Sequence, residues 1–154
     1  MARSPIACSA VIHAPPHIVY GIIADYREGH PRILPRPPFV SLAVEDGGTG
    51  AGTLIRVEMR VLGRRQSFRA RVAEPEPGRV LREANDTGDV TTFTVQPRAG
   101  GQDALVTIAT EMNRPGPLGT LQRWAAALLL RPVYDRELEL LAQEAARRVA
   151  GPSS

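Results

Sequence analysis

The order of hydrophobic patterns along the chain constrains its fold more than any other feature. A short apolar strand pattern over Ile6–Ile12 is followed by one helical segment over residues 15–25. Alternating, strand-like segments then occupy residues 39–112, and an amphipathic helical stretch fills Pro117–Val149. This order predicts an α+β domain in which a curved antiparallel sheet wraps around a long C-terminal helix and leaves a pocket between them.

The central region contains six predicted strands, separated by turns rich in Gly and Pro. They cover residues 39–45, 54–61, 66–73, 80–85, 90–95 and 104–112. Their spacing of roughly 10–12 residues is typical of an antiparallel meander. With Ile6–Ile12 they predict a seven-stranded sheet, preceded by one or two short helices between its first two strands. We expect one domain over residues 1–150 and a disordered tail over residues 151–154, since 154 residues suit a single domain.

All 19 basic residues of the chain are arginine, and the net charge is +3. Four of these arginines lie on the predicted outer face of neighbouring strands: Arg56, Arg60, Arg69 and Arg71. They could bind an anionic membrane or a protein, but glutamates on the same strands favour a solvated face with cross-strand ion pairs. Aromatic residues make up only 5% of the chain, which argues against a base-stacking nucleic-acid surface.

The single cysteine, Cys8, excludes an internal disulfide and favours a reducing compartment. The N-terminal residues lack a signal-peptide pattern, and the longest apolar stretch, residues 124–130, is too short to span a bilayer. We therefore expect a cytoplasmic protein without an integral membrane segment.

Metal and cofactor sites are not predicted. The only histidines, His13, His17 and His30, lack zinc-ligand spacing, because a strand turns into a helix between the first two. The glycine-rich segment 48–52 precedes a strand rather than a helix, so it reads as a turn and not as a phosphate cradle. No nucleophile–histidine pattern stands out, and no sequence feature indicates an oligomeric state.

Several short motifs follow one another in a characteristic order along the chain. Residues 11–25 show an apolar strand pattern, Ala14-Pro15, and an apolar helical pattern that ends in Asp25. Gly50-Ala-Gly52 leads into a predicted strand, residues 72–77 precede Val80-Leu81, and residues 138–141 repeat leucine near the C-terminus. In this order the motifs resemble the START-like (SRPBCC) helix-grip superfamily, and its polyketide cyclase/dehydrase-like branch in particular. The resemblance implies the helix-grip fold and a cavity for lipids, polyketides or other apolar molecules. Only some members are enzymes, and no catalytic motif carries over residue by residue.

Strand and helix periodicity identify candidate pocket residues. The inner strand faces and one face of the last helix offer Val57, Met59, Phe68, Ala70, Phe93, Val95, Trp124 and Leu128. Only one of the adjacent residues Arg82 and Glu83 can point inward, and we expect Arg82, which could clamp a ligand carboxylate or phenolate. The candidate catalytic residues are Tyr26, His30 and Arg82.

Three functions are consistent with these patterns. The first is binding of a small apolar or polyketide-like ligand between sheet and helix. The second is an aromatase/cyclase-type or dehydratase-type reaction on a carbonyl-rich substrate, which needs orientation and one or two acid/base groups. The third is a membrane or protein interaction through the arginine-rich outer face. We favour the first, because few acid/base groups fall on the predicted inner faces.

Overall fold

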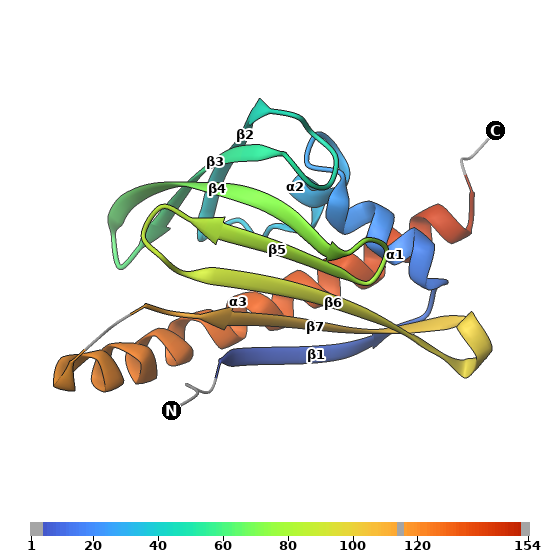
Figure 1. Ribbon diagram of the computed structural model, residues 1–154. Coiled ribbons are helices and arrows are strands. Elements are labelled where there is room, and N and C mark those ends of the chain that lie inside the picture. The colour runs from blue at the N-terminus through green and yellow to red at the C-terminus, as the bar shows by residue number, and fades with distance from the viewer. Residues whose placement is uncertain (1–4, 114–115, 152–154) are drawn as a thin grey trace.

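A single sheet of seven antiparallel strands curves around the helices, as the hydrophobic pattern predicts (Figure 1). The computed structural model describes residues 5–113 and 116–151, so residues 152–154 of the expected tail lie outside the described residues. The elements are β1 (Ile6–Ile12), α1 (Pro16–Ala24), α2 (Gly29–Ile33), β2 (Phe39–Asp46), β3 (Leu54–Val61), β4 (Arg64–Glu76), β5 (Val80–Asn85), β6 (Val90–Arg98), a 3₁₀ turn (Ala99–Gly101), β7 (Asp103–Glu111) and α3 (Pro117–Val149). The predicted helix-grip fold class is confirmed.

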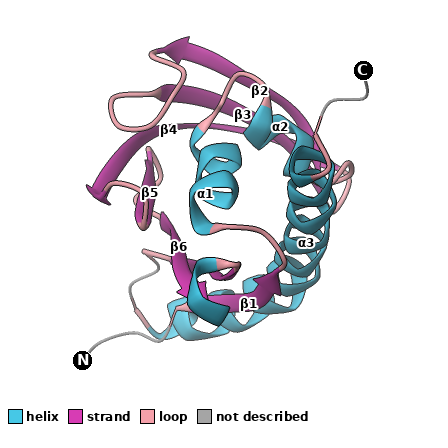
Figure 2. Cartoon of the chain, turned by 90° about the vertical axis from the view of Figure 1, so that its right-hand side faces the viewer, coloured by secondary structure: helices cyan, strands magenta, loops and turns pink. Residues whose placement is uncertain are grey.

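The strand order is β1-β7-β6-β5-β4-β3-β2, so β2 to β7 form a meander and β1 closes it beside β7. The curved sheet and α3 together form a ring when viewed along the strands, and α1 lies inside that ring (Figure 2). α3 packs against β1, α1 and α2. α1 therefore fills one end of the space between the sheet and α3. The turns between β3 and β4 and between β5 and β6 border the other end (Figure 1).

Alternation along the strands and apolar clustering in α1 create the core. In β7, Ala104, Val106 and Ile108 are buried at every second position. α1 begins at Pro16, whose missing N–H costs nothing in the first turn, and it buries Ile22 and Ile23 completely. Each such buried side chain stabilises the fold by about 1.5–3 kcal/mol, so α1 is fixed firmly at its end of the ring.

Glu74 on β4 ties the α1 end of the ring together. Its Oε2 accepts a hydrogen bond from Tyr20 Oη of α1 at 2.6 Å, and its Oε1 accepts one from the backbone N–H of Ala51 at 2.7 Å. Gly50 makes this approach possible, because a Cβ there would lie 2.2 Å from Glu74 Oε1. The turn between β2 and β3, the helix α1 and the strand β4 are thus held together by one carboxylate.

α3 is continuous through Pro132, but its two halves differ in packing. The C-terminal half buries Tyr134, Leu138, Leu141 and Ala145 against the core. The N-terminal half leaves Leu118, Leu121, Trp124 and Leu128 exposed.

Glu144 on α3 is buried and binds three arginines. It accepts hydrogen bonds from Arg147 and Arg148 on its own helix, at 2.5 and 3.1 Å, and from Arg32 of α2 at 3.4 Å. These guanidinium groups hold the pKa of the carboxyl down to about 2. The cluster thereby joins the C-terminal half of α3 to α2.

Candidate functional site: a cavity between sheet and helix

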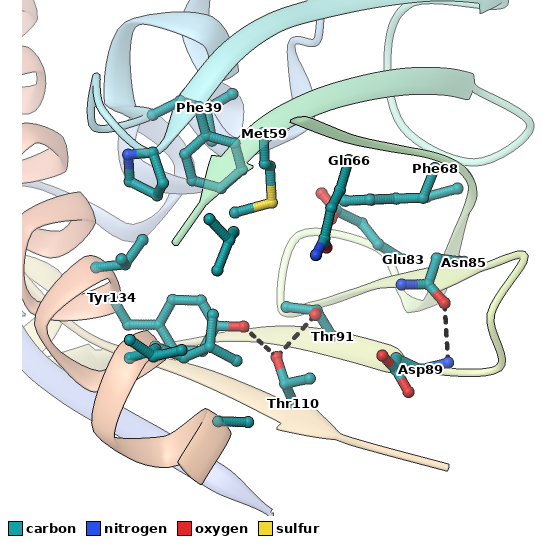
Figure 3. Close-up of a pocket in the computed structure, with 18 of the residues that line it drawn as sticks. Phe39, Met59, Gln66, Phe68, Glu83, Asn85, Asp89, Thr91, Thr110 and Tyr134 are labelled. Atoms are coloured by element: carbon teal, nitrogen blue, oxygen red, sulfur yellow. Dashed lines mark hydrogen bonds between the residues drawn. The ribbon is translucent and has the colours of Figure 1, made fainter. Parts of the chain in front are cut away.

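A cavity of about 500 Å³ lies between the inner face of the sheet and α3. Its walls are largely apolar and come from both layers. The sheet contributes Phe39, Met59, Phe68, Ala70 and Phe93, and α3 contributes Ala126, Leu130 and Val133. Figure 3 shows Phe39 and Met59 of the sheet and Tyr134 of α3 on opposite sides of this space.

The cavity opens away from α1. Its exposed lining residues come from the β3–β4 hairpin, the β5–β6 turn and the N-terminal half of α3, and they include Leu62, Gln66, Thr87 and Leu129. Its buried lining residues come from α2 and from the middle of the strands and of α3, and they include His30, Phe93, Tyr134 and Glu137. The cavity therefore has a mouth between the two turns and α3, and a deep end near α1 and α2.

Glu83 of β5 holds a buried polar cluster at the deep end. Tyr26 Oη donates a hydrogen bond to Glu83 Oε1 at 2.5 Å, and His30 Nε2 lies 3.6 Å from the same oxygen. The Tyr26 and His30 rings are stacked, with centroids 4.5 Å apart. His30 Nδ1 lies 2.7 Å from the carbonyl oxygen of Ile23, which can only accept, so Nδ1 carries a proton and Nε2 faces Glu83. Burial, reinforced by Glu83, raises the pKa of Tyr26, so its hydroxyl stays protonated and donating.

Glu137 of α3 is the second carboxyl group of the deep end. Its side chain is 3% exposed and lines the cavity, and its carboxyl forms no hydrogen bond or ion pair with the residues that the structure describes. Burial raises its pKa well above the usual value, and the neighbouring Glu83 raises it further. The deep end thus contains a carboxyl group whose protonated form is favoured and which faces the cavity.

Hydroxyl groups form a short chain along one wall of the cavity. Tyr134 Oη, Thr110 Oγ1 and Thr91 Oγ1 are linked in sequence, the last two at 2.8 Å, as Figure 3 shows. Toward the mouth, Asn85 Oδ1 accepts from the backbone N–H of Asp89 at 2.9 Å, and Asp89 accepts from the N–H of Asn113 at 3.0 Å. These hydrogen bonds fix the polar groups along the wall and give it polar character.

Several of the predicted pocket residues do line the cavity: Met59, Phe68, Ala70, Phe93 and His30. Val57 and Val95 are buried core residues outside its lining. Tyr26 is also outside the lining, but it is buried and contacts Glu83, which does line the cavity. Any role of these residues toward a ligand stays a prediction.

The predicted inward orientation of Arg82 is wrong. Leu81 is completely buried in the centre of β5, and the alternation of the strand then turns Glu83 inward and leaves Arg82 exposed. The sequence favoured the opposite choice because Glu83 seemed able to pair with an outer arginine. Tyr26 and His30 instead supply its partners from a distant part of the chain.

Trp124 and Leu128 do not face the cavity either. They are 64% and 60% exposed and lie on the side of α3 opposite Ala126, Leu130 and Val133. Both sets of residues are apolar, so helical periodicity alone does not tell which face of this half of α3 lines the cavity.

Glu137 was missed by the sequence prediction, although a signal exists. It lies in an apolar helical stripe with Tyr134, Leu138 and Leu141, where a charged residue is out of place. Such a residue on a buried face often marks a functional group.

All four arginines predicted on the outer sheet face, Arg56, Arg60, Arg69 and Arg71, are exposed, but Arg60 also lines the cavity. Arg69 Nε lies 2.8 Å from Glu45 Oε1. Neighbouring pairs include Arg65 with Glu58 at 3.8 Å, so acidic side chains are interspersed on this face.

Two negative findings hold for the described part of the chain. No group of three or more metal-ligating side chains occurs there, and none of its helices has the length and apolar character needed to cross a bilayer.

Comparisons with known proteins agree with this architecture. Residues 6–146 match the family model described as polyketide cyclase/dehydrase and lipid transport. The NMR structure of the KanY protein is 26% identical, covers 95% of this chain and 99% of its own, and has a TM-score of 0.80. An aromatase/cyclase from a Streptomyces species is 18% identical, covers 97% and 98%, and has a TM-score of 0.71.

A START superfamily protein from Mycobacterium smegmatis is 17% identical, with coverage of 94% and 99% and a TM-score of 0.64. The search of curated proteins finds none that matches. The last two structures have low sequence identity to this chain, so they support its fold alone. The family model matches nearly the whole sequence and therefore shows the family. The chain belongs to the polyketide cyclase/dehydrase and lipid transport family.

Proposed function

We propose that this protein binds a small, largely apolar molecule in the cavity between the sheet and α3. The observation that carries the proposal is the cavity itself, about 500 Å³ in volume, with apolar walls and polar groups gathered at its deep end. This volume falls within the usual range of ligand pockets, roughly 300–1,000 Å³, and such pockets combine apolar walls with few polar groups.

The apolar walls supply most of the binding free energy. Burying about 250 Å² of apolar ligand surface contributes about 6 kcal/mol at roughly 25 cal/mol per Å². This gain alone corresponds to a Kd of roughly tens of micromolar, and the entropy of association weakens the expected affinity for a simple apolar compound toward the millimolar range. Polar contacts at the deep end then decide which apolar molecule is preferred.

Titration with Nile red, a neutral apolar dye, tests the proposal. We expect saturable binding to one site and a blue-shifted emission, because the dye leaves water for an apolar pocket. Ala126→Trp should abolish this binding, since Ala126 lines the cavity and an indole would fill it. Ala125→Trp is the matched control: Ala125 is exposed on the same helix and does not line the cavity, so binding should persist.

The comparison of the two tryptophan variants decides whether the dye binds in the cavity. If both variants bind the dye like the parent protein, or if the parent does not bind it, the cavity is not a ligand site. Circular dichroism of each variant checks that a loss of binding does not reflect a loss of structure.

An aromatase/cyclase-type activity is a second candidate, favoured by the two carboxyl groups at the deep end. In an aldol cyclisation, a carboxylate such as Glu83 would take a proton from the carbon between two carbonyls of the substrate. That carbon would bond to the carbon of a third, more distant carbonyl of the substrate; the π bond of that carbonyl would open, and its oxygen would receive a proton from a neutral acid such as Glu137. Proton NMR of a short linear triketone should show faster ring closure with the parent protein than with Glu83→Gln. Equal rates with and without protein would exclude this activity toward the triketone.

A further inference from the structure

We propose that the deep end of the cavity selects ligands by the charge of their head group: it prefers a protonated amine, accepts a neutral hydroxyl and rejects a carboxylate. The inference rests on the proposed binding function and specifies its ligand class. It starts from the juxtaposition of Glu83 and Glu137, two carboxyl groups from opposite layers of the fold that face the same space.

Negative groups outnumber positive groups in the cavity lining. The described lining residues include three acids, Glu83, Asp89 and Glu137, and one arginine, Arg60, which is exposed. His30 is the other group that can carry a positive charge, and its Nε2 already faces Glu83. No buried arginine lies in this lining to neutralise Glu137 or to receive an anionic head group.

Glu137 is the observation that points to a ligand. A residue that is 97% buried normally has hydrogen-bond partners or a counter-charge for its carboxyl group, and within the described residues Glu137 has neither, so its carboxyl oxygens reach only the cavity space. It stays neutral because burial and the adjacent Glu83 both disfavour its ionised form. A ligand ammonium beside it would supply N–H donors and a positive charge that favours its ionised form.

The three head groups differ in what they bring to this end. An ammonium group brings a positive charge between two carboxyl groups and donates hydrogen bonds to both. A hydroxyl group donates one hydrogen bond and accepts one from the neutral acid of Glu137, without a change in charge. A carboxylate adds a further negative charge to a buried site that already holds two acidic groups, which is unfavourable.

Competition against Nile red with octylamine, octanol and octanoate at neutral pH tests the inference, because these probes share one chain and differ in the head group. We expect octylamine to displace the dye at the lowest concentration and octanoate to need at least about a tenfold higher concentration than octanol. This ranking is measured on the unmodified protein, so it does not depend on whether a variant folds.

Two variants then test whether Glu83 and Glu137 cause the preference among the head groups. In Glu137→Gln and Glu83→Gln the ratio between the octanoate and octylamine concentrations should fall by about tenfold or more, because each variant loses a carboxyl group that can ionise beside a bound ammonium. Glu139→Gln, the same substitution at an exposed position of α3, should leave the ratio unchanged.

Each remaining outcome has a defined meaning. If octanoate competes as well as octanol, or octylamine no better than octanol, the head-group inference is wrong while cavity binding stands. The same holds if no octyl compound competes although Nile red binds. If Nile red itself does not bind, the proposed function fails and not merely its ligand class.

Discussion

Replacing Glu144 by glutamine is expected to destabilise the protein by about 1.5–2 kcal/mol at neutral pH. The carboxylate is only 8% exposed, and it accepts hydrogen bonds from Arg147, Arg148 and Arg32. The last of these arginines belongs to α2, so the substitution weakens the junction between α2 and α3 as well as the last turns of α3. A glutamine side chain has the same shape but carries no charge to pair with the guanidinium groups.

The magnitude follows from the pKa of the carboxyl, which falls from 4.5 to about 2 in the folded protein. At roughly 1.4 kcal/mol per pH unit this difference corresponds to about 3 kcal/mol. Arg147 and Arg32 are about half exposed, so water and salt screen their attraction, and we take about half of that value. For a domain of this size, the resulting 1.5–2 kcal/mol lowers the melting temperature by about 3–8 °C.

The pH dependence of the effect has a definite sign. Since folding lowers the pKa of Glu144, its stabilisation is complete above the unfolded pKa of about 4.5 and is lost as the pH falls toward 2. Urea unfolding of parent and variant should therefore differ most near neutral pH, and the two curves should converge in acid.

Glu139→Gln is the matched control for this measurement. Glu139 pairs with Arg136 at 2.8 Å, but both side chains are more than half exposed, and its loss should cost less than about 0.5 kcal/mol. Equal effects of the two substitutions, or a Glu144→Gln effect that does not change between neutral and acidic pH, would refute the reasoning.

Three further predictions concern the core and the cavity. Leu81→Ala removes a completely buried side chain and should cost about 2–5 kcal/mol in urea unfolding; a cost below about 1 kcal/mol would mean that the sheet collapses around the gap. Tyr134→Phe removes the hydroxyl bonded to Thr110 and should cost about 1 kcal/mol, while Thr110 keeps Thr91 as a partner; no change in unfolding free energy would contradict this. Glu137→Gln should become more stable relative to the parent as the pH rises above about 4.5, because the unfolded Glu137 ionises there while burial keeps the native group neutral; a difference independent of pH would argue against a raised pKa.

The fold could be predicted from the sequence because its elements carry regular, local signals. Alternation in residues 54–61 places Ile55 and Val57 in the core and leaves Arg56 exposed, and Pro16 marks the start of α1. Each signal depends only on residues that are close together in the sequence, so it can be read without knowledge of the long-range packing. The order of these elements then allows few topologies.

The polar part of the site was harder to predict because its contacts are long-range. Glu83 points inward next to Tyr26, a residue 57 positions earlier in the chain, and no local pattern records that partnership. Leu81 and Glu83 share one face of β5, and the burial of Leu81 decides the orientation that sequence reasoning left between Arg82 and Glu83. On α3, Trp124 and Ala126 belong to opposite apolar faces, and only the packing against the sheet distinguishes them.

The unequal construction of the two ends of the cavity separates which ligand is chosen from how quickly it leaves. The α1 end is fixed by Ile22, Ile23 and the contacts of Glu74, so the groups there keep constant positions. The mouth is bordered by two sheet turns and by the half of α3 that packs least, and local opening is easiest in such segments. Substitutions in the β3–β4 hairpin should therefore alter the residence time of a bound molecule without altering which molecule is chosen.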